Sequence, residues 1–108
     1  MKTPFQIDER LIKQGGANLQ RGIETVGGQL YLTNQRLVFE SHRLNVQTGA
    51  VIIPISKIVS VKACWTKFLN IIPLLPNSIS VSTSDNQIYA LVVFNRNEWL
   101  SAITAQRG

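Results

Sequence analysis

The side chains most able to do covalent chemistry in this chain are its single histidine, His42, and its single cysteine, Cys64. A nucleophile is activated by a base within hydrogen-bond reach, and no spacing in the sequence pairs these two residues. The carboxylates are few and lie apart, so no pair is placed for general acid–base catalysis. His42 is expected near solvent at a strand end, and Cys64 is expected to be a small buried apolar side chain. We therefore predict no catalytic residues and no enzymatic activity.

Sites for a cofactor or a metal are also not predicted. The pairs Gly15-Gly16 and Gly27-Gly28 precede no helical pattern, which a dinucleotide fingerprint requires. No glycine loop ends in Lys-Ser or Lys-Thr, as a phosphate-binding loop does. One cysteine can form neither an internal disulfide nor a cysteine-only metal site, which fits a reducing compartment.

Eleven Lys and Arg against six Asp and Glu give a net charge of +5. A basic protein is attracted to anionic lipid headgroups, nucleic acid or acidic partners, although scattered basic residues can also serve solubility alone. Tyr31 and Tyr89 have no basic neighbour two residues away, which disfavours a nucleic-acid stacking platform. The charged first ten residues lack the apolar run of a signal peptide, so we expect a cytoplasmic protein.

Residues 68–76, FLNIIPLLP, contain six large apolar side chains among nine. Leaving six such side chains in water is costly, since burial of each contributes roughly 1.5–3 kcal/mol. Three interpretations stay open. The stretch folds back over the core, forms a surface for self-association, or inserts into a membrane beside Lys67.

The elements that must position these residues are predicted mainly from alternating polarity. Residues 27–42, GGQLYLTNQRLVFESH, alternate in two halves around Asn34-Gln35. Side chains switch faces at each strand residue, so each half has one mostly apolar face. Asn34 tolerates the positive φ of a tight turn, and the pattern therefore predicts a β-hairpin.

Similar alternation predicts further strands at residues 17–21, 51–56, 58–65, 78–83 and 87–94. Pro54 cannot donate to a ladder, so its strand is expected at an edge or a bulge. Val59 and Val61 are predicted to share one face of their strand, and Ile58 lies on the other. The strand at 87–94 is apolar on both faces, so something besides the main core should cover one of them.

A helix is predicted after Asn95, which is a suitable N-cap with Glu98 three residues later, as in a capping box. It should run to about Gln106. Trp99 and Ile103 are four residues apart and therefore share an apolar stripe. This stripe is expected to close the open end of a bent sheet.

The order and spacing of these motifs resemble the GRAM domain, a branch of the pleckstrin-homology-like superfold. The resemblance runs through residues 27–45, IPISKI at 53–58, PNSI at 76–79, YALVV at 89–93 and WLSAI at 99–103. It covers about residues 9–104 and is similar to small bacterial stand-alone versions. It implies a mainly β domain over residues 1–108, with its core at about 9–106. The implied architecture is a seven-stranded bent antiparallel sheet, or partly open barrel, capped by a C-terminal α-helix.

The resemblance also implies where ligands bind. In pleckstrin-homology-like domains, headgroups dock among the loops at the open end, here residues 22–28, 43–50 and 84–87. The implied anion-binding residues are Arg21, His42, Arg43 and Lys62. The first of these loops holds Glu24 and no basic residue, which departs from the pattern of tight phosphoinositide binders.

We predict a non-catalytic binding or scaffolding domain. One hypothesis is protein interaction with self-association, and the alternative is a peripheral membrane module for anionic lipid. The candidate partner surface comprises Phe68, Ile71, Leu74 and Leu75, with Leu91 or Val93 as a second patch.

Overall fold

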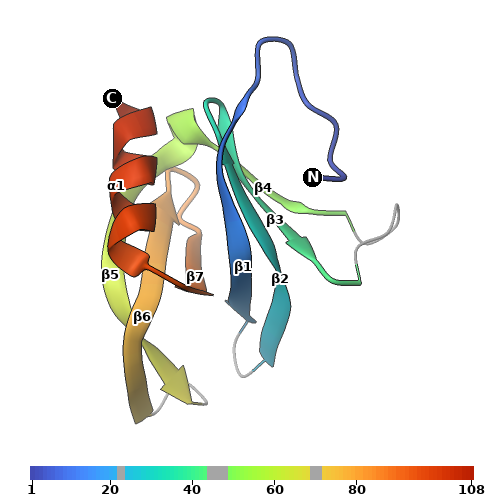
Figure 1. The fold of residues 1–108 in the computed structure, drawn as a ribbon. Coiled ribbons are helices and arrows are strands. Elements are labelled where there is room, and N and C mark those ends of the chain that lie inside the picture. The colour runs from blue at the N-terminus through green and yellow to red at the C-terminus, as the bar shows by residue number, and fades with distance from the viewer. Residues whose placement is uncertain (22–23, 44–48, 69–71) are drawn as a thin grey trace.

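Alternating apolar residues along seven segments form the strands of one bent antiparallel sheet in the computed structural model (Figure 1). The structure describes residues 1–21, 24–43, 49–68 and 72–108, with side chains described outside 65–76. The elements are β1 (Leu11–Arg21), β2 (Glu24–Thr33), β3 (Arg36–Ser41), β4 (Val51–Pro54), a 3-10 turn (Ile55–Lys57), β5 (Ile58–Phe68), β6 (Ile72–Thr83), β7 (Ile88–Val93) and α1 (Arg96–Arg107). The strand order is β4-β3-β2-β1-β7-β6-β5, which confirms the predicted fold class.

The core lies inside the bend of the sheet and is closed by α1. One face of each strand supplies the apolar side chains that alternation predicted, including Leu30, Leu37 and Ile79. Trp99 and Ile103 of α1 are buried in the same cluster, as their spacing predicted. In Figure 1, α1 stands beside β5 and β6 at the open side of the sheet.

Two arginines attach α1 to the edge strand β5. The Arg96 Nη1 atom donates to the Cys64 carbonyl oxygen at 3.0 Å, and the Arg107 Nη2 atom donates to the Val59 carbonyl oxygen at 2.9 Å. These bonds use two carbonyls of a strand that ends the sheet. Edge carbonyls with partners in the same chain are less available to pair with another strand.

The β2–β3 hairpin turns at Asn34-Gln35 as predicted, but not through the expected backbone conformation. Among the described non-glycine residues, positive φ occurs at Asp8, Asn86 and Asn95 and not at Asn34. The Asn34 side chain instead accepts a hydrogen bond from the Arg10 N–H at 2.7 Å and donates to the Asp8 carbonyl oxygen at 3.0 Å. The Asn34 side chain therefore holds the segment before β1 in place. This long-range contact could not be predicted from the local turn sequence.

Two local predictions are wrong. The pairing of β5 with β6 is irregular between Ile58 and Ser60, so Ile58 is buried and Val59 points to solvent. Asn95 is the N-cap residue of α1, but its left-handed backbone (φ 55°) leaves its side chain without a capping hydrogen bond. An N-cap side chain reaches the first turn from the extended region, which explains the missing capping box. Glu98 instead pairs with Lys13 at 3.6 Å.

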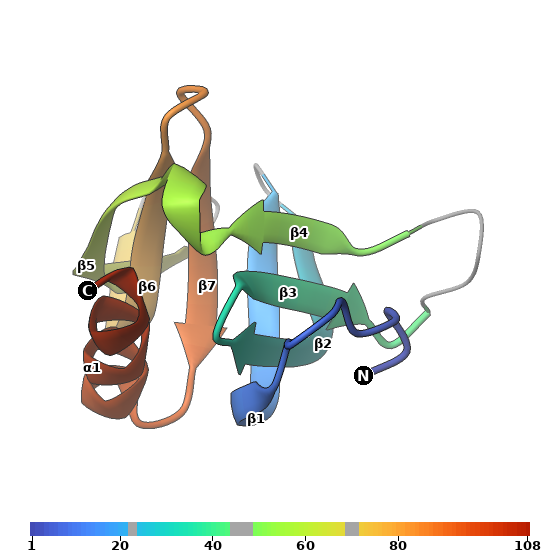
Figure 2. The same ribbon diagram turned by 90° about the horizontal axis from the view of Figure 1, so that it is seen from above.

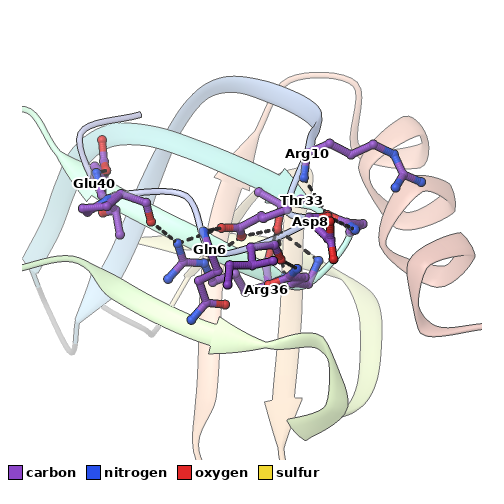
Figure 3. A network of polar contacts seen from close by, with 12 residues as sticks. Gln6, Asp8, Arg10, Thr33, Arg36 and Glu40 are labelled. Atoms are coloured by element: carbon purple, nitrogen blue, oxygen red, sulfur yellow. Dashed lines mark hydrogen bonds and ion pairs between the residues drawn. The ribbon is translucent and has the colours of Figure 1, made fainter.

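Strand β3 is buried on both faces, because the N-terminal segment, residues 1–10, lies against the face that points away from the core (Figure 3). On this face the Arg36 guanidinium makes a bidentate contact with Glu9, at 2.7 Å from Nε and 2.9 Å from Nη2. Both side chains are almost fully buried, at 8% and 0% exposed. Arg36 also donates to the Pro4 carbonyl oxygen at 2.6 Å, and Thr33 donates to Glu9 at 2.6 Å.

Glu40 lies four residues after Arg36 on the same face of β3, and it binds the start of the N-terminal segment. Its carboxylate accepts the Lys2 N–H at 3.0 Å, and the Thr3 N–H and hydroxyl, each at 2.7 Å. Burial alone raises the pKa of Glu40, but these hydrogen bonds outweigh it and the net pKa is lowered. Arg36 and Glu40 are thus both buried, with partners from the N-terminal segment.

The Glu9–Arg36 pair should make stability depend on acid pH. The hydrogen bond from Arg36 lowers the pKa of Glu9 from 4.5 to about 2. Because the folded pKa lies below the unfolded value, the pair contributes fully above pH 4.5, and this contribution is lost as the pH falls toward 2. We expect Glu9→Gln to lower the free energy of unfolding at neutral pH by about 3 kcal/mol, since a buried charge loses its ionised partner.

Urea unfolding over this pH range measures the effect. The free energy of unfolding of wild type should fall more steeply in acid than that of Glu9→Gln. The control is Glu98→Gln, which removes the exposed pair with Lys13 and should cost less than about 1 kcal/mol. Equal pH slopes for wild type and Glu9→Gln would contradict the assignment.

Gly28 is required where β2 approaches β3. A Cβ atom at Gly28 would lie 2.2 Å from the Glu40 carbonyl oxygen and 2.8 Å from the Phe39 Cζ atom. At Gly16 the nearest atom, the Gln29 Nε2, would be 4.0 Å away. We expect Gly28→Ala to destabilise the fold by about 1–3 kcal/mol and Gly16→Ala to be neutral or stabilising. Thermal unfolding of both variants tests this, and a wild-type melting temperature for Gly28→Ala would disprove it.

Candidate functional site

Three of the four predicted basic site residues lie where β1 ends, β2 begins and β3 ends. Arg21 is the last residue of β1, and His42 and Arg43 directly follow β3. The His42 N–H donates to the Gly27 carbonyl oxygen at 3.0 Å, which holds the end of β3 against the start of β2. Figure 2 shows the end of β1 and the β6–β7 turn at the same end of the sheet.

Arg21 and Arg43 line one cavity of about 290 Å³. Both residues are exposed, and they come from different strand ends, Arg21 from the end of β1 and Arg43 from the residues after β3. The rest of the wall is small or apolar: Val26, Phe39, Ser41, Gly49, Ala50 and Val51. Two guanidinium groups over a wall without a carboxylate suit an anionic group, because Arg forms bidentate hydrogen bonds with phosphate and carboxylate.

His42, directly after β3, does not line the cavity that Arg21 lines. With Arg43 it lines a neighbouring cavity of about 510 Å³, whose wall also includes Glu24 and Gly27. The His42 ring stands over Gly27, where an added Cβ would be 3.4 Å from the His42 Cδ2 atom. Arg43 therefore lines both of these cavities, whereas Arg21 lines the first and His42 lines the second.

Lys62 does not join this group. It lies on β5, where it pairs with Ser80, and Ser80 pairs in turn with Ala90 of β7. Since neighbouring strands are about 4.8 Å apart, β5 is about 14 Å from β1 across the sheet, and further from β3. The structure thus brings Arg43 together with Arg21 on one side and His42 on the other, and places Lys62 elsewhere.

Two acidic residues also lie at this end of the sheet, and their negative charge disfavours an anion near them. Glu24 stands directly opposite Arg21 in the β1–β2 ladder. In the β6–β7 turn, a hydrogen bond from the Thr83 hydroxyl lowers the pKa of Asp85, so this carboxylate is charged at neutral pH. The Arg21–Arg43 cavity has no carboxylate among its lining residues, although Glu24 neighbours Arg21 in the ladder and lines the second cavity with Arg43.

The residues weighed for catalysis are far apart. His42 is exposed after β3, and Cys64 is half-buried on β5, five strands away in the sheet. Across the described residues, no cluster of three or more His, Cys, Asp or Glu could hold a metal ion.

The predicted partner surface has two outcomes. Phe68, Ile71, Leu74 and Leu75 have side chains outside the described residues. Leu91 and Val93, predicted as a second patch, instead belong to the core, at 1% and 3% exposed. Strand β7 is apolar on both faces, so the sequence alone could not indicate which face the sheet would turn inward.

Sequence reasoning also missed the small residues that open the Arg21–Arg43 cavity. Gly49 has a φ of +66°, and with Ala50 it leads into β4 without a large side chain. The single signal available was the glycine at the end of a long predicted loop.

Comparison with known proteins identifies the family of this chain. Residues 1–98 match the GRAM domain family. The chain belongs to the GRAM family. Comparison with curated protein sequences finds no significant match.

Solved structures resemble this GRAM domain in fold. The C-terminal domain of an unknown protein from Leishmania infantum is 21% identical, with a TM-score of 0.76, over 92% of this chain and 84% of that one. The Vps36 N-terminal PH domain is 13% identical, with a TM-score of 0.69, over 94% of this chain and 84% of that one. The N-terminal PH domain of ARAP2 from human is 14% identical, with a TM-score of 0.66, over 99% and 85%.

These likenesses confirm the pleckstrin-homology-like fold that the sequence predicted. Domains of this fold generally mediate protein or lipid binding. Within the described residues, no helix has the length and apolar character to cross a bilayer.

Proposed function

We propose that this GRAM domain is a non-catalytic module that binds an anionic group, such as a phosphorylated lipid headgroup, at the open end of its sheet. The observation that carries the proposal is the cavity of about 290 Å³ shared by Arg21 and Arg43. The mechanism is electrostatic capture on a rigid scaffold, with no bond made or broken. Placement at the cytoplasmic surface of a membrane is part of the same proposal.

The expected affinity of one domain is low. A basic side chain near an anionic membrane contributes about 1 kcal/mol, so Arg21, His42 and Arg43 together contribute about 3 kcal/mol. This is weaker than a millimolar contact, which corresponds to about 4 kcal/mol. Stable attachment would therefore need several copies on one surface, since linked sites gain effective concentration.

Sedimentation with vesicles tests this proposal. Wild type should bind phosphatidylcholine vesicles that contain phosphatidylserine or a phosphoinositide more strongly than phosphatidylcholine alone. Arg21→Ala and Arg43→Ala should each weaken binding roughly five-fold, because each removes about 1 kcal/mol. Binding should also weaken with added salt.

The matched control is Arg10→Ala, which removes an exposed arginine next to the opposite end of β1. This variant should bind as wild type does, and so should Lys62→Ala. No preference for anionic vesicles would overturn the proposal. An equal loss in Arg10→Ala would show that net charge, and not this cavity, governs binding.

A second candidate function is protein interaction through self-association. The supporting observation is the apolar sequence at 68–76, with six large apolar side chains among nine residues. We propose Phe68, Ile71, Leu74 and Leu75 as contact residues.

Light scattering over a range of protein concentrations measures self-association. We expect wild type to show an oligomer mass and Leu74→Asp to shift it toward the monomer, because a carboxylate in an apolar contact is strongly desolvated. Ile71→Asp should act alike, and Ile7→Asp, in an exposed part of the N-terminal segment, is the control. A monomeric mass for wild type at every concentration would reject this candidate.

A further inference from the structure

A hollow with polar walls lies on the outer face of the sheet, where β1, β2 and β7 meet. Its volume is about 240 Å³, which is room for about eight waters at about 30 Å³ each. Its lining includes Gly16, Asn18, Gln29, His42, Val92 and Phe94. It shares no lining residue with the Arg21–Arg43 cavity, so it is a separate site that does not depend on the proposed anion binding.

The register of β1 and β2 creates the hollow. Gly16 stands opposite Gln29, and Asn18 stands opposite Gly27, so glycines and amides alternate around these neighbouring positions of the ladder. Each amide side chain lies near the glycine opposite. An added Cβ at Gly16 would lie 4.0 Å from the Gln29 Nε2 atom, and one at Gly27 would lie 3.2 Å from the Asn18 Oδ1 atom. The glycines thus leave open space between two amide groups.

Hydrogen-bonding groups converge on this space from several strands. The same added Cβ at Gly27 would lie 3.7 Å from the His42 Nε2 atom, so the imidazole stands beside the Asn18 amide. In the part of the chain that the structure describes, the side chains of Asn18, Gln29 and His42 hold no hydrogen-bond partner, whereas Asn77 of β6 already has one. An amide both donates and accepts, and an imidazole adds two ring nitrogens. This set suits hydroxyl groups, which also both donate and accept.

An exposed aromatic ring completes the wall. Phe94, directly after β7, is 80% exposed, and Val92 adds a second apolar side chain. None of the lining residues is Lys, Arg, Asp or Glu, so the hollow offers no ion pair to a charged ligand. A sugar ring carries C–H groups on its faces, hydroxyls around its edge and no charge. Its face therefore matches Phe94 and Val92, and its edge matches the amides.

We propose that this hollow binds the ring of an uncharged sugar, with a C–H face against Phe94 and hydroxyls on Asn18, Gln29 and His42. A nucleobase also has apolar faces, but a nucleotide carries phosphate, for which the hollow holds no cation. A free sugar and a glycolipid headgroup present the same ring, so both are sources of this chemistry. The affinity should be millimolar, because one ring makes few contacts and must offset the entropy lost on binding.

Backbone amide chemical shifts measure this binding on the folded protein. The probes are the methyl glycosides of glucose, galactose and mannose, each from about 0.1 to 100 mM, the range of weak complexes. We expect at least one glycoside to give saturable shifts that cluster at Gly16, Asn18, Gly27 and Val92. Glycerol at equal hydroxyl concentration is the control ligand, because it has hydroxyls but no ring face.

Substitutions within the hollow test the assignment. Gly16→Val should fill it and weaken binding at least about five-fold, since its Cβ has no heavy atom closer than 4.0 Å and valine suits a strand. Asn18→Ala and Gln29→Ala should each weaken binding about five-fold, the net contribution of one hydrogen bond. Phe94→Ala should have a similar effect and, at an exposed position, should leave the melting temperature unchanged.

Two matched controls accompany these variants. Ile88→Ala removes another exposed apolar side chain of β7, 71% exposed and outside the hollow, and should bind as wild type does. Arg43→Ala should also keep sugar binding, which separates this site from the anion site. Circular dichroism checks that each variant is folded.

Sedimentation with phosphatidylcholine vesicles that contain a galactosyl lipid distinguishes the sources. Sedimentation that Gly16→Val abolishes would support a glycolipid headgroup, and its absence in a protein that binds the free glycosides would support a free sugar.

Several results would overturn the inference. No saturable shift with any glycoside would exclude a sugar site, and so would equal shifts with glycerol. Unchanged affinity in both Gly16→Val and Phe94→Ala would show that the sugar binds elsewhere. Binding of adenosine without binding of any glycoside would identify a nucleobase site instead.

Discussion

The burial of one continuous apolar surface inside a single bent sheet is the constraint on which the rest of this structure depends. Seven antiparallel strands supply one face each, but a sheet with two ends leaves its core open along one side. Helix α1 closes that side with Trp99 and Ile103, and arginines at its two ends bind carbonyls of β5. The helix therefore completes the core through its apolar side chains, and its arginines bind carbonyls of the edge strand β5.

The same constraint explains the burial of charge on β3. Its inner face is apolar, and its outer face is covered by the N-terminal segment, so Arg36 and Glu40 are removed from water. A buried charge is tolerated where it is paired and hydrogen-bonded, which Glu9 and the first backbone N–H groups provide. Among described buried side chains, no polar atom lacks a partner. The segment before β1 is thus held by specific polar contacts and not by apolar burial alone.

The rigid sheet and its ends have different roles in the proposed function. The ladders fix where Arg21 and Arg43 emerge, while small residues before β4 leave space between them. The carboxylate of Glu24 lies beside Arg21 and that of Asp85 lies in the β6–β7 turn, so this end carries both signs of charge. A binding domain of this kind needs only complementary charge at a fixed position.

Much of the fold followed from local pattern. Alternation placed the β2–β3 hairpin and the strands β6 and β7, and the missing N–H of Pro54 placed its strand at an edge. The 3.6-residue period placed Trp99 and Ile103 on one stripe of α1. These features were predictable because each depends on residues close in sequence. The resemblance to the GRAM family added the strand count and the closing helix. Of the predicted basic residues, Arg21, His42 and Arg43 do lie at one end of the sheet.

Other features were decided only when distant segments met. Which face of β7 turned inward could not be predicted, because both faces are apolar and the sheet, not the strand, selects one. An irregular β5–β6 register decided that Ile58 faces the core and Val59 faces solvent. The burial of Arg36 and Glu40 depended on a segment 27 or more residues away in the chain. By itself the sequence determined the periodicity of the elements and the net charge. Tertiary structure decided which side chains share a cavity, a core or a surface, since those are relations between residues that the chain order does not contain.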